Sequence, residues 1–315
     1  MTLKRRIGLL FASLFSLWMY GQRIVFTPQW TPQAQFAGYY VAQKKGFYKD
    51  AGLDVDIQHP STSDPALNRL LEGRSNVITM QLLPAMVEID RKIPLVNILQ
   101  TSQRNALLIV SRTDSIRTFQ DLKGKKVGVW KVGFGDFGYI ADNELGLGIR
   151  WIPFLEGTNL YISGAIDATL AMSYNEYLQI VASGHGDKPV LRFSDSDYDY
   201  PEDGVYVSAD FYQRYPEKAE AFAEASRRGW EYARSHPEET LDIVMELVTK
   251  EHVHTNRIHQ KWMLEEIFRL QCKEGEDVPS FKLEREDVER LCGLLMKHNR
   301  IQNPVSYERV KGGKK

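Results

Sequence analysis

The sequence is poor in cysteine. Among its 315 residues only Cys272 and Cys292 occur, which is too few for a disulfide framework or for a metal site built from cysteines. Their separation still permits a single disulfide bond, which an oxidising compartment would allow. The chain also lacks an excess of charge of either sign, since 40 basic and 41 acidic residues leave a net charge of −1. A nucleic-acid-binding protein normally carries a basic excess on one face, so nucleic acid is not an expected partner.

Motifs for catalysis and cofactor binding are missing as well. The sequence contains no HExxH pair, no P-loop and no recognisable Ser/His/Asp or Cys/His arrangement. We therefore expect no catalytic residue, no metal and no cofactor. The acidic stretch at residues 195–203 lacks the glycine and terminal glutamate spacing of an EF-hand. We interpret it as a solvated hinge loop.

Apolar runs long enough to cross a membrane, which takes about 20 residues, are also missing. The longest run, residues 7–20, follows Lys4, Arg5 and Arg6, and no acidic residue precedes Asp50. A basic start followed by a short apolar run is typical of a secretory signal peptide. We expect residues 1–21 to be removed near Gly21 and the mature protein to be periplasmic. An uncleaved membrane anchor remains the alternative.

What the sequence does contain is a regular alternation of short apolar and amphipathic segments. The expected strands are residues 23–27, 53–57, 76–80, 95–100, 106–111, 126–130, 150–154, 168–172, 190–193 and 204–208. The expected helices between them are residues 35–45, 65–72, 84–90, 118–124, 137–145 and 174–182. Four further helices follow at residues 216–235, 237–249, 257–271 and 284–297. This order predicts an α/β fold with a mainly parallel sheet.

The length favours two domains, but no linker of low complexity separates them. We therefore expect two interleaved α/β lobes joined by a hinge. Residues 22–112 and 205–315 would form lobe one, whose helical C-terminal tail wraps it, and residues 113–204 would form lobe two. A cleft between two such lobes is the natural place for a small-molecule ligand.

Residues 30–42 read WTPQAQFAGYYVA and residues 45–55 read KGFYKDAGLDV. Both resemble the opening of one group of ABC-transporter solute-binding proteins. That group includes binders of thiamine-pyrimidine precursors, sulfonates, nitrate and riboflavin, and it is related to the fungal thiamine-pyrimidine synthases. Shorter similarities occur at residues 121–129, 164–168, 174–176, 229–233 and 236–239. The resemblance implies a type II periplasmic-binding-protein fold, in agreement with the order of elements.

The resemblance also implies a function. The mature chain would be a monomeric receptor that binds a small molecule and docks on an ABC permease in the membrane, and a pyrimidine precursor of thiamine is the first expected ligand. Two alternatives remain open. One is a synthase-like enzyme, although the cysteine-rich iron-binding motif of the synthases is absent here. The other is a sensor domain that reports its ligand to a separate membrane kinase.

Three candidate ligand-binding residues follow the first expected strand, whose carboxyl end is where open α/β sheets bind ligands. The indole of Trp30 suits stacking on a flat heterocycle, or it packs a turn against the core. Gln33 and Gln35 offer amide groups near a helix N-terminus, or they cap that helix. On the return strand, Tyr206 is a further candidate.

The other candidates come from the second half of the sheet pattern. Trp130 and Phe134 border the Gly-rich segment 131–137, which either approaches a ligand or forms a tight turn that needs positive φ. Asn175 and Glu176 begin a helix. Glu accepts a hydrogen bond from an exocyclic amine and Asn both donates and accepts, although Glu176 also suits a helix N-terminus. A carboxylate here disfavours nitrate or sulfonate as ligand.

Overall fold

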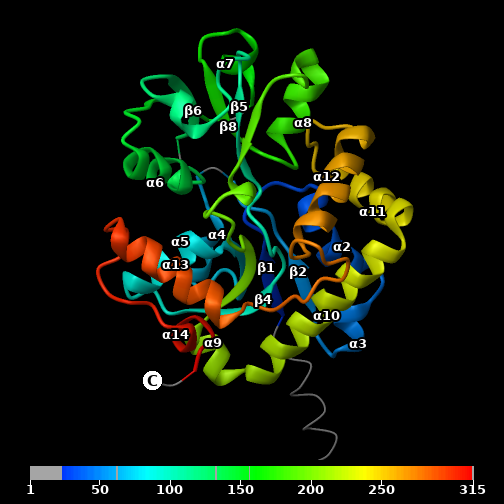
Figure 1. Cartoon of the computed structure of the whole chain (residues 1–315). Coiled ribbons are helices and arrows are strands. Elements are labelled where there is room, and N and C mark those ends of the chain that lie inside the picture. The colour runs from blue at the N-terminus through cyan, green and yellow to red at the C-terminus, as the bar shows by residue number, and fades with distance from the viewer. Residues whose placement is uncertain (1–22, 62, 132, 156, 314–315) are drawn as a thin grey trace, which may run out of the picture. The chain divides into compact units, whose positions relative to one another are not determined.

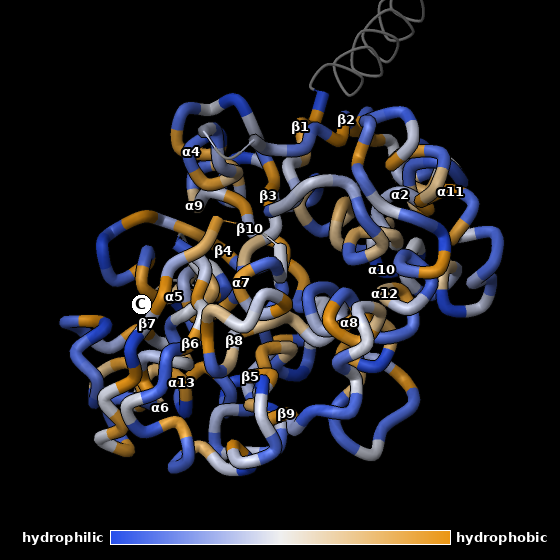
Figure 2. The backbone as a smooth tube through the Cα atoms, turned by 90° about the horizontal axis from the view of Figure 1, so that it is seen from above, coloured by the Kyte–Doolittle hydropathy of each residue, from blue (hydrophilic) through white to orange (hydrophobic). Residues whose placement is uncertain are grey.

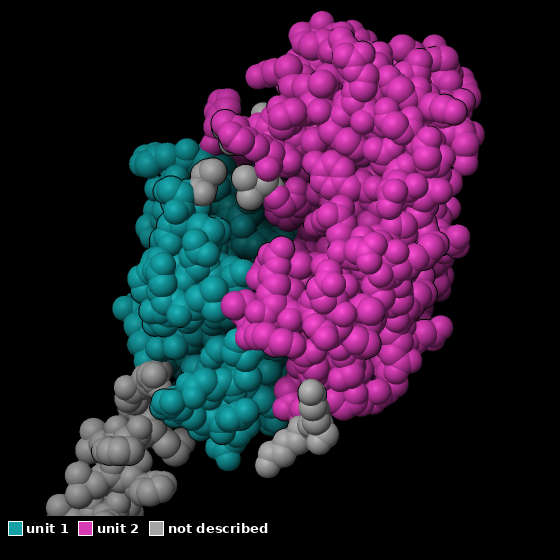
Figure 3. All heavy atoms as spheres, turned by 90° about the vertical axis from the view of Figure 1, so that its left-hand side faces the viewer, with its two compact units in different colours: residues 1–80, 94–98, 205–253 teal, residues 81–93, 99–204, 254–315 magenta. Residues whose placement is uncertain are grey.

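The computed structural model of the protein describes residues 23–61, 63–131, 133–155 and 157–313. The expected signal peptide, residues 1–21, lies outside the described residues. The chain forms two compact units, which Figure 3 draws in separate colours. Unit 1 holds the described residues up to 80 together with residues 94–98 and 205–253, and unit 2 holds residues 81–93, 99–204 and 254–315.

The division is interleaved, but it differs from the expected lobes in three places, because residues 81–93, 99–112 and 254–315 belong to unit 2. Residues 99–112 belong to unit 2, because strand β5 (Leu107–Ser111) pairs with β8 (Ala168–Met172) and β9 (Val190–Arg192). Sequence alternation identifies such a strand without showing its partners, so the boundary at residue 112 was placed too late.

The helical tail is also divided. Helices α10 (Pro216–Ser235) and α11 (Pro237–Lys250) lie in unit 1, whereas α12 (Arg257–Leu270) lies in unit 2, where it contacts α8 (Glu176–Ile180). The remaining helices of the tail, α13 (Arg285–Lys297) and α14 (Tyr307–Val310), also belong to unit 2. The tail therefore does not wrap lobe one as a whole.

Unit 1 is built on a five-stranded sheet with the order β2-β1-β3-β10-β4. Strand β1 is parallel to both of its neighbours, with Ile24 opposite Val55 and Phe26 opposite Val77. The strands are β1 (Ile24–Thr27), β2 (Val55–Ile57), β3 (Val77–Gln81), β4 (Leu95–Gln100) and β10 (Asp203–Ser208). The remaining helices of the unit are η1 (Ala34–Phe36), α2 (Ala37–Lys44), α3 (Phe47–Asp50), α4 (Ala66–Leu71) and α9 (Ala209–Arg214).

Helices α2, α3 and α10 group beside this sheet (Figure 1) and pack on one another. Two glycines allow α2 and α10 to approach closely. A Cβ on Gly38 would lie 2.2 Å from the ring of Trp230, and one on Gly229 would lie 2.1 Å from the carbonyl oxygen of Gly38. Beneath them, Phe26 lies edge-on to Tyr39 and Phe222, at ring distances of 4.9 and 5.2 Å. Aromatic packing of this kind forms the core of unit 1.

Unit 2 is built on a mixed sheet with the order β7-β6-β8-β5-β9. Strand β6 (Lys126–Trp130) is parallel to β7 (Arg150–Phe154) and β8, whereas β5 is antiparallel to β8 and β9. The other elements up to residue 195 are α5 (Leu82–Asp90), η2 (Phe119–Leu122), α6 (Asp136–Leu145), α7 (Asn159–Ile162), η3 (Val181–His185) and η4 (Phe193–Asp195). Helices α6 and α8 flank the sheet (Figure 1).

One cluster in the core of unit 2 is mainly aliphatic. All five residues of β5 and of β8 are buried, and the hydropathy along each segment can be followed in Figure 2. Leu108, Val110, Ala171 and Ile180 pack together in one cluster with Tyr161, whose hydroxyl donates to the carbonyl oxygen of Ser111 at 2.7 Å. Within the described chain, no helix has both the length and the apolar character needed to span a bilayer.

Candidate functional site

Trp130 and Glu176 come together at one edge of the sheet in unit 2. Strands β6 and β8 are parallel neighbours, so their carboxyl ends meet at the same edge. Trp130 is the last residue of β6, and Glu176 follows β8 by four residues. The Trp130 indole N–H donates to the Glu176 carboxylate. Two residues predicted separately from the sequence are therefore joined directly.

The carboxylate of Glu176 is buried, with 8% of the residue exposed. It also accepts hydrogen bonds from the Met172 backbone N–H and from Nδ2 of Asn175, both at 3.1 Å. Burial raises the pKa of Glu176, and these donors together with Trp130 oppose that rise. With three neighbours already donating to it, the carboxylate holds its surroundings in place and has little capacity left for a ligand.

Asn175 occupies the N-cap position of α8, with φ −130° and ψ −87°. While its Nδ2 donates to Glu176, its Oδ1 accepts from two donors: Nε2 of Gln179 at 3.1 Å and Nε2 of His259 at 3.0 Å. His259 belongs to α12, far away in the sequence, and was not predicted as part of a site. Asn175 is only half-buried, so it is the more accessible member of the pair.

The loop after β6 contains the tight turn that the sequence allowed for. Gly133 has φ 71° and Phe134 has φ 60°, a left-handed conformation that is uncommon for a residue with a side chain. The ring of Phe134 lies 5.9 Å from that of Trp130 at an angle of 73°. Trp130 is itself 6% exposed, so Phe134 is the more accessible of the two rings.

In unit 1, Trp30 is held through its backbone. Its carbonyl oxygen accepts from Nδ1 of His59 at 2.6 Å, and Nε2 of His59 lies 3.0 Å from the hydroxyl of Tyr40. Because a carbonyl only accepts, Nδ1 carries the proton and neutral Nε2 accepts from Tyr40. Burial lowers the pKa of His59 to about 4, which keeps the ring uncharged at neutral pH. Sequence reasoning missed this histidine.

Gln33 and Gln35 bond to each other. Nε2 of Gln33 donates to Oε1 of Gln35 at 2.6 Å, and the two residues are 7% and 4% exposed. The helix that follows, η1, receives no side-chain cap from Gln33. Tyr206 lies on β10 with 0% of its surface exposed. The unit 1 candidates, apart from Trp30, are thus interior residues in this structure.

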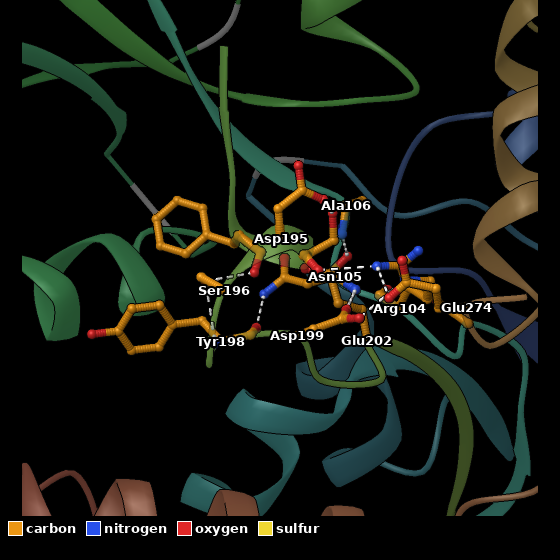
Figure 4. A network of polar contacts seen from close by, with 12 residues as sticks. Arg104, Asn105, Ala106, Asp195, Ser196, Tyr198, Asp199, Glu202 and Glu274 are labelled. Carbon is orange, nitrogen blue, oxygen red and sulfur yellow. Dashed lines mark hydrogen bonds and ion pairs between the residues drawn. The ribbon is translucent and has the colours of Figure 1, made fainter. Parts of the chain in front are cut away.

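The acidic stretch at residues 195–203 is solvated only in part, since Asp195 and Asp197 are exposed whereas Glu202 is buried. Asp199 accepts from Nε of Arg104 at 3.0 Å and from the Asn105 N–H at 2.9 Å, and the Glu202 carboxylate accepts from the Ala106 N–H at 2.9 Å (Figure 4). Glu202 is buried, which, together with the charge of Asp203, raises its pKa well above the usual range. Backbone donors next to β5 pull this stretch inward, and acidic composition alone could not reveal them.

The next question is whether any side chains are placed to bind a metal ion or to form a disulfide bond. Within residues 23–313, apart from the three positions left undescribed, no three His, Cys, Asp or Glu side chains are placed to hold a metal ion. Neither Cys272 nor Cys292 forms a disulfide bond in the structure. Sγ of Cys292 accepts from the Val305 N–H at 3.3 Å.

The fold is that of the periplasmic binding proteins, as predicted from the order of elements. The periplasmic aliphatic sulphonate-binding protein SsuA of Escherichia coli superimposes with a TM-score of 0.66 and 13% identity, over 92% of this chain and 99% of its own. Within this class, the chain belongs to the NMT1/THI5-like family, whose model matches residues 33–240. The family prediction is therefore confirmed.

Two relatives match nearly the whole chain. The riboflavin-binding protein RibY of Chloroflexus aurantiacus is 21% identical over 308 residues, which is 93% of this chain and 87% of the relative. The formylaminopyrimidine-binding protein of Halalkalibacterium halodurans is 23% identical over 298 residues, which is 89% of this chain and 86% of the relative.

Proposed function

We propose that this protein is the solute-binding component of an ABC-type import system and that it binds a small, flat nitrogen heterocycle. A pyrimidine precursor of thiamine is the first candidate. Family membership and two relatives that bind riboflavin and formylaminopyrimidine support this proposal. The observation that carries it is the hydrogen-bonded group of Trp130, Glu176 and Asn175 at the carboxyl ends of β6 and β8.

The chemistry of this group suits a neutral heterocycle better than an anion. Asn175 supplies a carboxamide, and Trp130, which donates to the neighbouring Glu176, supplies an aromatic ring that Phe134 contacts. Among the described residues, neither Asn175 nor Glu176 has a Lys or Arg partner. An anionic ligand such as a sulfonate would find no positive charge there, and the buried carboxyl of Glu176 would oppose it when ionised.

We further propose that residues of both units contact the ligand, with Trp30, Gln33, Gln35 and Tyr206 as the candidates of unit 1. The liganded form would be the one that the permease recognises. Residues 1–21 would direct export to the periplasm, where the mature chain would act as a monomer.

A thermal-shift assay on the chain from residue 22 tests the proposal. The probes are 4-amino-5-hydroxymethyl-2-methylpyrimidine, riboflavin and an alkanesulfonate. A probe at 100 times its Kd stabilises the folded state by about 2.7 kcal/mol, and we expect this effect from the aminopyrimidine. A response to riboflavin or to the sulfonate alone would overturn the choice of ligand, and no response to any probe would overturn the receptor function.

The variant Glu176→Ala sharpens this test. It leaves the indole N–H of Trp130, the Met172 N–H and the Asn175 amide without their acceptor, and we expect aminopyrimidine affinity to fall about 100-fold. Glu176→Gln keeps one acceptor oxygen and should lose about tenfold. Glu286→Ala, at an exposed position on α13, is the matched control and should bind like the wild type.

The two alternative functions, a synthase-like enzyme and a sensor domain, would each give a different experimental result. Conversion of pyridoxal phosphate in the presence of iron by the purified chain would establish a synthase-like enzyme. A membrane kinase whose activity depends on the liganded protein would establish a sensor. Uptake of the aminopyrimidine that is lost when the protein is removed from its host supports transport.

A further inference from the structure

His259 reaches the candidate site from α12, a helix that lies beyond residues 33–240 matched by the family model. Its Nε2 lies 3.0 Å from Oδ1 of Asn175, 84 positions away in the sequence. A carboxamide oxygen only accepts, so Nε2 carries the proton. The backbone N–H of His259 donates to Oδ1 of Asn256 at the start of α12, which fixes the position from which the ring extends.

The contacts on both sides of Asn175 specify one orientation of its carboxamide. Oδ1 accepts from His259 and Gln179, and Nδ2 donates to the Glu176 carboxylate. Rotating the amide by 180° would place Oδ1 against a carboxylate oxygen of Glu176, which only accepts, and Nδ2 against the present donors of Gln179 and His259. The contact with Glu176 is then lost in either tautomer of His259, and leaving buried polar groups unpaired is costly.

One hydrogen of the Asn175 amide stays available. Nδ2 has two hydrogens, and a single acceptor, Oε1 of Glu176, is its partner among the described residues. Asn175 is half-buried, and the second hydrogen has no acceptor among the described residues. In this orientation Asn175 offers a ligand a donor, whereas its oxygen is already fully occupied by two donors.

We propose that His259 is a positioning residue for ligand recognition. By donating to Oδ1, it acts together with the Glu176 carboxylate, which accepts from Nδ2, to hold the carboxamide of Asn175 so that the amide nitrogen is the group offered to the ligand. The site then selects molecules that present a hydrogen-bond acceptor there, as an unprotonated pyrimidine ring nitrogen does. The selectivity rests on the proposed receptor function, whereas the orientation of the amide does not.

The state of His259 agrees with this role. Partial burial lowers the pKa of the ring below its usual value, so the ring is neutral at neutral pH and has one N–H to place. Among the described residues, Nδ1 has no hydrogen-bond partner. The contact with Asn175 therefore fixes the tautomer.

Three variants separate the parts of the proposal. His259→Phe keeps a ring but removes the donor. His259→Gln restores a donor near the position of Nε2. His254→Phe is the matched control, because His254 is exposed and makes no hydrogen bond with the described part of the chain.

The first measurement needs no ligand. In ¹⁵N-labelled protein, the two side-chain amide protons of Asn175 give separate signals whose chemical shifts report their hydrogen bonds, and His259 should be protonated at Nε2. We expect His259→Phe to shift the Asn175 signals, His259→Gln to return them towards their wild-type positions, and His254→Phe to leave them unchanged. Unchanged Asn175 signals in His259→Phe would overturn the positioning role, whatever the ligand is.

The second measurement is calorimetric titration with 4-amino-5-hydroxymethyl-2-methylpyrimidine. His259→Phe should weaken binding about tenfold, and His259→Gln should return to within about threefold of the wild type. Equal affinity of His259→Phe and the wild type would overturn the selectivity. If the wild type binds none of the probes, the proposed function fails and the NMR result alone decides whether His259 positions Asn175.

Discussion

The candidate residues of the two units are held in different ways. In unit 1, Gln33 and Gln35 bond to each other inside the protein, and Trp30 is fixed through its carbonyl oxygen. In unit 2, Trp130, Asn175 and Glu176 form one connected group in which Asn175 remains half-buried.

This difference teaches that the longest sequence match is not the best guide to the site. Much of residues 30–42 is packing. Gly38 allows α2 to touch α10, Tyr39 lies edge-on to Trp230, and Tyr40 bonds to His59. The short segment 174–176, in contrast, places polar groups at the edge of a sheet. We therefore expect unit 1 variants to affect stability most and unit 2 variants to affect ligand selectivity most.

The largest expected effect comes from Gly38→Ala. The new methyl group would lie 2.2 Å from the ring of Trp230, so α2 and α10 must separate, at a cost of about 3 kcal/mol. Urea denaturation measures the change. Gly293→Ala is the matched control, because a Cβ there meets no atom within 4 Å in α13; it should be neutral or stabilise by about 0.5–1 kcal/mol. Equal stabilities of the two variants would contradict the packing role of Gly38.

His59 in unit 1 and Glu202 in unit 2 should contribute to the pH dependence of stability with opposite signs. His59 in unit 1 has a pKa of about 4, below its usual 6.5. The folded state therefore prefers the neutral ring, and this stability is lost as pH falls from 6.5 towards 4. Glu202 in unit 2 has a pKa raised well above 4.5 by burial and by Asp203. Its folded form retains the proton, so its contribution is lost as pH rises above 4.5.

Two conservative variants distinguish these contributions in urea midpoints measured from pH 4 to 9. His59→Asn should flatten the acid side of the stability profile, and Glu202→Gln should flatten the side above pH 4.5. Exposed His254→Asn and Glu286→Gln serve as controls. A wild-type slope in either buried variant would mean that the residue does not titrate as described.

The smallest expected effect on stability comes from Phe134→Asn. Phe134 is left-handed, and Asn adopts that conformation at lower cost, so relief of strain offsets the lost ring contact with Trp130 to within about 0.5 kcal/mol. Affinity for the aminopyrimidine should nevertheless fall about threefold to tenfold, because stacking area is removed. A stability loss without any change in affinity would make Phe134 a packing residue.

The elements themselves could be predicted from the sequence because their signals are local. Apolar alternation and terminal glycines identified β1, β6 and β8 to within a residue or two at each end. Strand pairing is not local. The antiparallel pairing of β5 with β8 and the contact of α12 with α8 place both β5 and α12 in unit 2, and no periodicity along the chain specifies either.

The proximity of some candidate residues was predictable to a similar extent. Asn175, Glu176 and Trp130 could be named as candidates because each follows or ends a strand, where the position along the chain implies a position in space. His59 and His259 were missed because each acts through a partner far away in the sequence, at separations of 29 and 84 residues. Neither histidine lies in a sequence pattern that indicates such a partner.

The contact from His259 to Asn175 has a consequence for comparing relatives. A carboxamide can present either its nitrogen or its oxygen, and here a helix outside the matched segment makes that choice. Two proteins could therefore share the residues Tyr-Asn-Glu and still offer opposite groups to a ligand, the amide nitrogen in one and the amide oxygen in the other. For this family, assigning a ligand requires the residue behind the motif as well as the motif itself.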